Sequence, residues 1–495
     1  MKKLFNFRPV LFGALSIAAG IFFSVLSAYI GVWSIVVPII VIAALSVLFF
    51  GIFKSFSFIR YGIIFTVLFV VGFALLIGKV TFSASADGQY FETDFVGTVS
   101  SVGQINNSDK HYVILTDVKG ENVNFNNTNV YLVTDTEGLK RGDEVKGNSV
   151  FVKNALNFDD LYKLEKQIVF VDQAEVTNLI KTKESALSGE FVANKIIDAI
   201  YTFTPKDEAG VMVALLLGRS DGIDRDVLSR YRMAGIAHIF AVSGMHVGFF
   251  FYIFGFIFGL VGIKRWQNTV LSTIITLFYA IMCASFSAYR ALIMCFIFGI
   301  AKSFGNKYDF LNSIFLSMIV ILLLFPSGLF SVGFLLSYSA VISVALWSSQ
   351  IARIFSFLPK KLASSFSTSL AVSAGTLPIV ALSFGYASAI TVFVNLLFMP
   401  IVPLVYVLSL IGGVLAVTFS YGNVFLIISS YVCNTINVIL THVDLEKYLL
   451  VFRGNLILYV LYSVIFVLTS EKINIPEKFR KGLYVLLPVA AFSLI

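Results

Sequence analysis

Two histidines, His238 and His246, flank the pair Ser243 and Gly244 in an otherwise apolar stretch. A serine near a histidine suits nucleophilic chemistry, because the imidazole can activate the hydroxyl. A Ser-Gly pair can also interrupt a helix and expose backbone N–H groups that bind an anion, or it can let helices pack closely, and both interpretations stay open. On an ideal helix the two histidines lie about 80° apart, so they need not face each other. Each histidine is also compatible with a purely structural role.

Arginines surround this stretch, and one of them lies inside the apolar part of the chain. Arg290 sits between two apolar runs without an acidic neighbour in sequence. Such an arginine faces a helix bundle or an aqueous cavity, where it could offset phosphate charge, or it snorkels from a short loop to lipid headgroups. Tyr289 beside it could stack on a base or belong to an interfacial aromatic belt. Arg219, Arg230 and Arg232 form either a cationic rim or a solvated surface.

The composition predicts that membrane helices position these residues. The chain has 495 residues, is 58% hydrophobic and only 13% charged, and has a mean hydropathy of +0.89. About twenty apolar residues suffice for a helix to cross a bilayer. Pro400 and Pro403 interrupt one apolar run, which is typical of broken helices that line a cavity. We predict spans at residues 10–30, 32–53, 61–81, 236–263, 270–285, 291–304, 310–325, 329–347, 366–384, 390–419, 424–442, 456–469 and 483–495.

A polar region follows the first three predicted spans. Short alternating runs bounded by Gly, Asn and Asp predict five strands at 95–102, 112–118, 130–134, 144–152 and 167–171. Five such strands are typical of a small β-barrel such as an OB-like fold, and other small β-folds give the same sequence pattern. Residues 87–184 hold sixteen acidic and ten basic side chains, a net charge of −6, whereas the whole chain carries +8. The predicted fold class is a polytopic α-helical membrane protein with an inserted small β-barrel domain.

Basic residues in the loops predict the orientation. Lys and Arg precede the first span and separate the second from the third, so the positive-inside rule places the N-terminus in the cytoplasm and the β domain outside. Residues 185–203 predict an amphipathic helix that either lies on the membrane surface or packs on the bundle. We therefore expect four parts: transmembrane helices at 1–82, the β domain at 86–180, interfacial helices at 185–234, and a second transmembrane bundle at 235–495.

Four sequence stretches carry a resemblance to a known family. The run AGIAHIFAVSGMHVG at 234–248 closely resembles the core motif of the ComEC family of bacterial competence proteins. SAYRA at 287–291 is similar to the family's Ser-x-x-Arg-Ala element, and GFLLSY at 333–338 to its Gly-Phe-x-Leu-Ser pattern. NLLFMP at 395–400 resembles its Asn-Leu-x-x-x-Pro turn. The order of parts also matches, so the resemblance covers nearly the whole chain.

The resemblance implies an inner-membrane channel that passes single-stranded DNA into the cytoplasm during natural transformation. It implies a DNA path lined by the motif residues, to which Ser287, Ser337 and Asn395 are added. Many relatives end in a metallo-β-lactamase-like domain with a His-x-His-x-Asp-His motif, which the four histidines of this chain do not form. Phe286 also stands where relatives often have proline. The resemblance implies that the β domain contacts DNA, a role that its net negative charge does not favour.

We expect no cofactor, no metal, no enzymatic activity and, without a Walker motif, no nucleotide hydrolysis by the chain itself. Single-stranded DNA and membrane lipid are the expected partners, with a DNA receptor, a separate nuclease and a cytoplasmic motor as further candidates and a homo-oligomer left open. Two alternatives remain: an intramembrane serine hydrolase, with His442 as the distant base, and a small-solute transporter.

Overall fold

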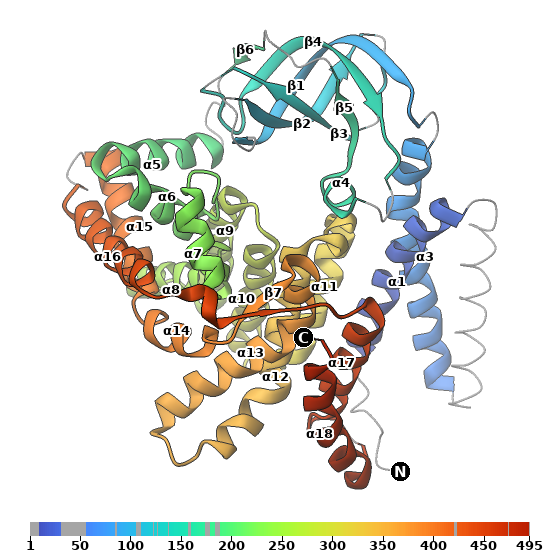
Figure 1. The fold of residues 1–495 in the computed structure, drawn as a ribbon, viewed down its shortest axis with the longest axis vertical. Helices are drawn as coiled ribbons and strands as arrows, with labels where there is room; N and C mark the ends of the chain where they lie inside the picture. Colours follow the sequence, from blue (N-terminus) through green and yellow to red (C-terminus); the bar gives the residue numbers. More distant parts are fainter. Residues whose placement is uncertain are drawn as a thin grey trace. The chain divides into compact units, whose positions relative to one another are not determined.

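The computed structural model describes residues 9–30, 56–84, 87–104, 110–121, 123–125, 127–136, 138–156, 160–173, 179–183, 189–419, 423–473 and 475–494. Contacts divide the chain into two compact units. One comprises Pro9–Asn194 with Phe315–Ser331, and the other comprises Lys195–Ile314 with Val332–Ile495 (Figure 1). The predicted span at 32–53 lies outside the described residues.

In the first unit, two apolar helices pack through glycine. Helix α1 (Pro9–Ile30) lies against α3 (Phe56–Ala84). A Cβ atom added to Gly20 would lie 2.1 Å from the Phe69 carbonyl oxygen, and one added to Gly72 would lie 2.4 Å from the Ile17 carbonyl oxygen. Small residues at a membrane helix interface let the backbones approach this closely. The two predicted spans at 10–30 and 61–81 are therefore confirmed as helices, and these helices pack against each other.

The predicted β domain is a closed five-stranded barrel. The barrel strands follow the order β1-β2-β3-β5-β4, and β4 pairs again with β1. Strand β3 runs parallel to β5, and the other pairs are antiparallel. All five predicted strands are confirmed, with boundaries extended at several ends. The strands are β1 (Tyr90–Gln104), β2 (His111–Gly120), β3 (Asn129–Thr134), β4 (Glu144–Lys153) and β5 (Ile168–Asp172), with β6 (Ile180–Lys183) added at the edge of β4.

Phenylalanine rings fill the barrel. Phe125 lies 4.8 Å from Phe170 and 5.9 Å from Phe151, and Phe95 lies 5.4 Å from Phe151, between ring centroids. All four rings are fully buried. Gln167 joins helix α4 (Leu161–Lys166) to β5, the last barrel strand in sequence. Its side-chain amide donates to the Ser327 hydroxyl over 2.9 Å. This bond ties the barrel to the 3-10 turn η3 (Pro326–Phe330) of the same unit.

The second unit is a helical bundle. Nine helices among the described residues of the whole chain are long and apolar enough to cross a membrane, and two shorter apolar helices accompany them. These helices make the chain a polytopic membrane protein, as predicted. Most of α11 (Phe310–Leu324) belongs to the first unit, together with η3. The elements of the second unit are α5 (Gly189–Phe203), whose first residues belong to the first unit, α6 (Lys206–Leu217), α7 (Arg225–Met233), η2 (Ala237–Phe240), α8 (Gly244–Leu260), α9 (Arg265–Cys283), α10 (Phe286–Ser303), α12 (Val332–Ile354), α13 (Lys360–Phe384), β7 (Tyr386–Ser388), α14 (Thr391–Phe398), α15 (Val402–Phe419), α16 (Asn423–His442), η4 (Leu445–Tyr448), β8 (Leu449–Val451), α17 (Leu456–Leu468) and α18 (Glu477–Phe492).

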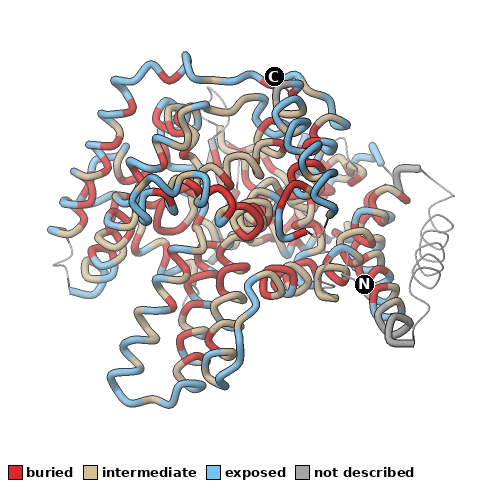
Figure 2. The backbone as a smooth tube through the Cα atoms, turned by 90° about the horizontal axis from the view of Figure 1, so that it is seen from below, coloured by how far each residue is buried: buried red, intermediate tan, exposed pale blue. Residues whose placement is uncertain are grey.

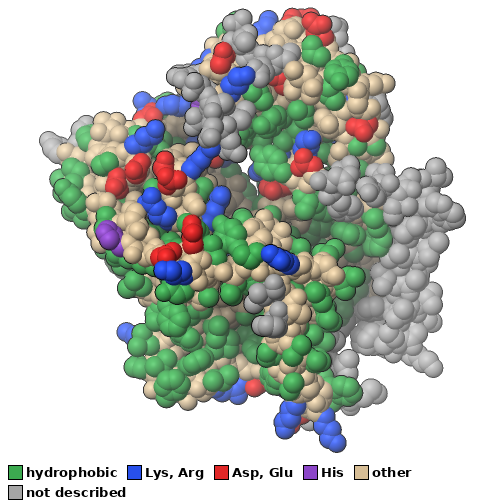
Figure 3. All heavy atoms as spheres, in the orientation of Figure 1, with side chains coloured by type: hydrophobic (Ala, Val, Ile, Leu, Met, Phe, Trp, Pro, Cys, Tyr) green, Lys and Arg blue, Asp and Glu red, His purple; other side chains and the backbone are tan. Residues whose placement is uncertain are grey.

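The predicted span at 390–419 is broken, as its prolines predict. Helix α14 ends at Phe398, and α15 starts at Val402. Proline lacks an N–H group and clashes with the preceding turn, which explains the break near Pro400. Buried residues follow the inner faces of the helices (Figure 2), while hydrophobic side chains cover much of their outer surface (Figure 3).

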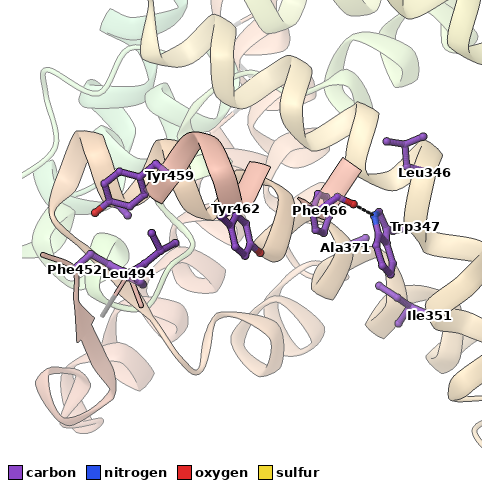
Figure 4. Close-up of a cluster of buried hydrophobic side chains, with 10 residues drawn as sticks. Leu346, Trp347, Ile351, Ala371, Phe452, Tyr459, Tyr462, Phe466 and Leu494 are labelled. Atoms are coloured by element: carbon purple, nitrogen blue, oxygen red, sulfur yellow. Dashed lines mark hydrogen bonds between the residues drawn. The ribbon is translucent and has the colours of Figure 1, made fainter. Parts of the chain in front are cut away.

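An aromatic core joins α12 and α13 to the C-terminal helices. Trp347 stacks on Phe466 with ring centroids 5.2 Å apart and donates its indole N–H to the Phe466 carbonyl over 3.1 Å (Figure 4). Tyr462 continues this stack and donates to the Ala374 carbonyl over 2.9 Å. This core holds α17 in place on the bundle.

Helix α5 has one face on the bundle. Ala193, Ile196 and Ile200 are buried, and a Cβ atom added to Gly413 would lie 2.9 Å from Ile196. Phe191 remains exposed. The interpretation that this helix packs on the bundle therefore holds for its buried face, while Phe191 lies on the exposed face.

Candidate functional site

The motif at 234–248 forms a turn followed by the start of a helix. Gly235 has a φ of +76°, which only glycine adopts without strain. A 3-10 turn covers 237–240, Ser243 is extended at φ −89° and ψ 167°, and α8 begins at Gly244. The predicted span at 236–263 corresponds to an apolar segment from Ala237 to Leu260, whose first residues form the 3-10 turn and the Ser243 cap and whose α-helix begins at Gly244. This start leaves backbone N–H groups at the head of α8.

His246 caps this helix from inside its first turn. The Ser243 backbone N–H donates to His246 Nδ1 over 3.1 Å, and the Ser243 hydroxyl lies 3.4 Å from the same nitrogen. A glutamate often fills this role in a capping box. Because Nδ1 accepts, a neutral His246 carries its proton on Nε2, which is buried without a hydrogen-bond partner. The ring lies 4.4 Å from that of Tyr406.

Arg290 lies beside the head of α8. Its side chain is 6% exposed, its Nη1 donates to the Ser337 carbonyl of α12, and its Nε is buried without a hydrogen-bond partner. A Cβ atom added to Gly244 would lie 3.8 Å from Arg290 Nη2. The Tyr338 ring centroid is 5.7 Å from the guanidinium carbon. No carboxylate pairs with Arg290 within the part of the chain that the structure describes.

This arrangement places two positive features side by side. The N-terminus of a helix carries about half a positive charge from its aligned peptide dipoles. A guanidinium adds a full charge and several N–H donors that suit phosphate oxygens. A buried cation is costly unless an anion accompanies it. The site at Arg290 and Gly244 can therefore bind an anionic group, and a phosphate fits its donors.

The neighbouring turn orients Arg290. Arg219 donates from Nη2 to the Met282 carbonyl at the end of α9 over 3.4 Å, where a cation stabilises the helix terminus. Ala284 then adopts a left-handed conformation with a φ of +44°, which is uncommon for a residue other than glycine. The Ser285 hydroxyl accepts the Ala288 N–H over 3.2 Å and starts α10. Arg219 thus binds the end of α9, next to the turn that leads into α10 and Arg290.

The other predicted site residues lie in different surroundings. His238 is exposed, and its Nδ1 lies 3.3 Å from the Gly235 carbonyl oxygen. Arg232 is exposed on α7. Asn395 is buried on α14, donates to the Ser369 hydroxyl over 3.1 Å, and has an amide oxygen without a partner. Ser287 and Tyr289 are half-buried in the first turn of α10. Arg290 therefore contacts Ser337 and lies near Gly244, and Ser243 contacts His246. Asn395 makes its contact elsewhere, with Ser369.

Two tyrosines of the site were missed by the sequence analysis. Tyr406 on α15 contacts His246, and Tyr279 on α9 donates to the Leu216 carbonyl over 2.7 Å. Both lie in apolar runs, where a tyrosine signals either an interface belt or a buried contact, so the signal was weak. In the described residues, no group of three His, Cys, Asp or Glu side chains could hold a metal ion.

Comparisons with known proteins match about half of the chain. The family model described as "Competence protein" matches residues 215–472, just over half of the chain. "ComE operon protein 3" of Bacillus subtilis (strain 168) is 29% identical over 251 residues, covering 50% of this chain and 32% of that protein. An uncharacterized protein of Aquifex aeolicus (strain VF5) is 25% identical over 256 residues, covering 50% of this chain and 57% of the relative. No solved structure matches significantly.

Proposed function

Because the chain belongs to the ComEC family of competence proteins, we propose that it conducts single-stranded DNA across a bacterial cell membrane into the cytoplasm. The observation that carries the proposal is that Arg290 is buried at the head of α8 and that no carboxylate among the described residues pairs with it. A passing DNA strand supplies the missing anion with each of its phosphates. Phosphate contacts are independent of sequence, which suits a protein that must accept any strand.

The site is built for transient phosphate contact. The guanidinium is held at one corner by the Ser337 carbonyl, while Nε has no hydrogen-bond partner. The N–H groups at the head of α8 add donors that need no rearrangement when a phosphate arrives. A single cation binds one phosphate weakly enough to release it, because conduction requires sites that are entered and left easily. Energy for one-way transport then comes from a cytoplasmic motor or from capture of the strand inside, and a DNA receptor and a separate nuclease complete the proposed set of partners.

Loop charges give the proposed orientation. Thr269, near Lys264 and Arg265, lies 3.2 Å from Ser303 between hydroxyl oxygens, so the basic α8–α9 loop and the basic end of α10 share one side. Arg353 pairs with Glu471, which places the α12–α13 and α17–α18 loops together. Both groups of loops are rich in Lys and Arg, and the positive-inside rule assigns such loops to the cytoplasm. We place the N-terminus in the cytoplasm and the barrel outside.

We further propose that the chain is a conduit and not a hydrolase. The Ser243 hydroxyl is 3.4 Å from His246 Nδ1, yet the same nitrogen also accepts the Ser243 backbone N–H. A general base needs a third group to orient it, and the other ring nitrogen of His246 has no such partner. His442, the distant candidate base, contacts the Val438 carbonyl of its own helix over 2.8 Å. The pair is therefore better explained as a helix cap.

Uptake by cells tests the proposed function. We expect a strain without this protein to lose internalisation of fluorescently labelled DNA by at least about a hundredfold, because a polyanion has no other hydrated path through hydrocarbon. Uptake of small solutes should remain unchanged in the same cells. Restored DNA uptake from a plasmid copy provides the control. Normal DNA entry together with the loss of a small solute would favour the transporter alternative.

A further inference from the structure

Aromatic rings from three helices meet in the first turns of α8. His246 lies 4.4 Å from Tyr406 of α15, and Phe250 stacks on Tyr279 of α9 at 4.6 Å with 15° between the ring planes. The Tyr279 and Tyr406 rings are 6.5 Å apart at 63°. His246, Tyr279 and Tyr406 are 1%, 3% and 1% exposed. We call these four residues the aromatic cluster; their rings are continuous, with Phe250 half-buried and the other three buried.

The aromatic cluster follows directly on the phosphate site. His246 stands two residues after Gly244, which adjoins the Arg290 guanidinium. The rings then continue along one face of α8, where Phe254 lies 5.0 Å from Phe250 and 6.3 Å from Phe258. Residues four apart share a helix face and are separated by about 6 Å along its axis. A cationic position is thus followed by a row of flat side chains.

Arg290 and this row match the two chemical parts of a DNA strand. Phosphates are bound by cations, and bases stack on aromatic rings without sequence preference. Closely packed rings also exclude ions and water when no strand is present, because apolar constrictions gate by dewetting. We propose that the aromatic cluster is the constriction of the conduit: it is shut in this structure, and its rings receive the bases of an entering strand. This inference rests on the proposed function and adds the position and chemistry of the closure.

The contacts of the two tyrosines indicate which side moves. Tyr279 is anchored by a 2.7 Å hydrogen bond to the Leu216 carbonyl. Tyr406 is held by ring contacts and by a longer hydrogen bond of 3.5 Å to the His246 carbonyl. It also stands one turn after the break at 399–401, where α14 and α15 are separate helices. A pivot of α15 at this break withdraws Tyr406 from His246 and leaves Tyr279 in place.

Ion flux in the absence of DNA tests the closure. The purified full chain is reconstituted in liposomes, and flux of a small ion is compared between Tyr406→Ala, Tyr406→Phe and the wild type. We expect Tyr406→Ala to raise the flux on the order of tenfold, because removing the ring opens the constriction. Tyr406→Phe should stay closed, because it keeps the ring and loses only the hydroxyl with its hydrogen bonds.

Tyr462→Ala is the matched control, since Tyr462 is equally buried but lies in the aromatic core of α12, α13 and α17. We expect it to remain closed once its folding is verified by gel filtration. Unchanged flux in a well-folded Tyr406→Ala protein would overturn the inference, as would an equal leak in Tyr462→Ala. Because no DNA is present, the outcome is independent of whether the proposed DNA transport holds.

Discussion

Replacing Arg290 by leucine is expected to lower DNA uptake by at least about a hundredfold while the protein still inserts in the membrane. The substitution removes the buried cation and leaves the head of α8 without a partner for phosphate. It also relieves the cost of a buried charge, so folding should survive the loss of the hydrogen bond to Ser337. Transformation frequency, normalised to the amount of protein in the membrane, measures the effect.

Two further variants make this result specific. Arg290→Lys keeps the charge but loses the planar fork, so we expect an intermediate loss of uptake, about tenfold. Arg353→Leu removes an exposed arginine whose ion pair with Glu471 lies between two loops, and uptake should stay within about twofold because exposed pairs contribute little. Wild-type transformation by Arg290→Leu would remove this residue from the DNA path.

Gly235→Val is expected to destabilise the protein by at least about 3 kcal/mol and to abolish uptake. A residue other than glycine at a φ of +76° is strained by roughly 1–2 kcal/mol. The added Cβ would also lie 1.9 Å from the Thr391 hydroxyl oxygen, so η2 and α14 would have to separate. Thermal unfolding in detergent and the amount of protein in the membrane report this loss.

Gly248→Ala provides the control for the glycine effect. This residue lies in α8 of the same motif, and an added Cβ meets nothing within 4 Å. Alanine is favoured over glycine inside a helix by roughly 0.5–1 kcal/mol, so the variant should be as stable as the wild type or slightly more stable. If Gly235→Val were equally stable, the tight turn against Thr391 would not be required for the fold.

The barrel was largely predictable because its strands alternate. In β3, for example, Val130, Leu132 and Thr134 are buried while Asn129, Tyr131 and Val133 are half-buried. This period of two is readable in a single sequence. Strand β6 was missed because its four residues, Ile-Lys-Thr-Lys, are short and carry two lysines, which is typical of a sheet edge.

The site was only partly predictable. Local signals at Ser243 and Gly244 correctly suggested an interrupted helix, and the isolated charge of Arg290 suggested a buried position. Hydropathy gave the extent of the apolar segment but not the residue at which α8 begins, because it does not register a glycine with positive φ such as Gly235. Tyr279 and Tyr406 were missed for another reason. The contacts of Tyr406 with His246 and with Tyr279 depend on how α9 and α15 pack against α8. The spacing of residues within one segment does not indicate such packing between segments.

The central claim is that the head of α8 faces a hydrated path for a polyanion, and labelling of a cysteine at Ser243 tests it most directly. Ser243→Cys is introduced after Cys283, Cys295 and Cys433, the cysteines of the chain, have been replaced. We predict that a membrane-impermeant thiol reagent added outside modifies this cysteine and that single-stranded DNA slows the reaction several-fold, because both occupy the same aqueous space. A cysteine that reacts only after denaturation, or at a rate that DNA does not change, would contradict the account.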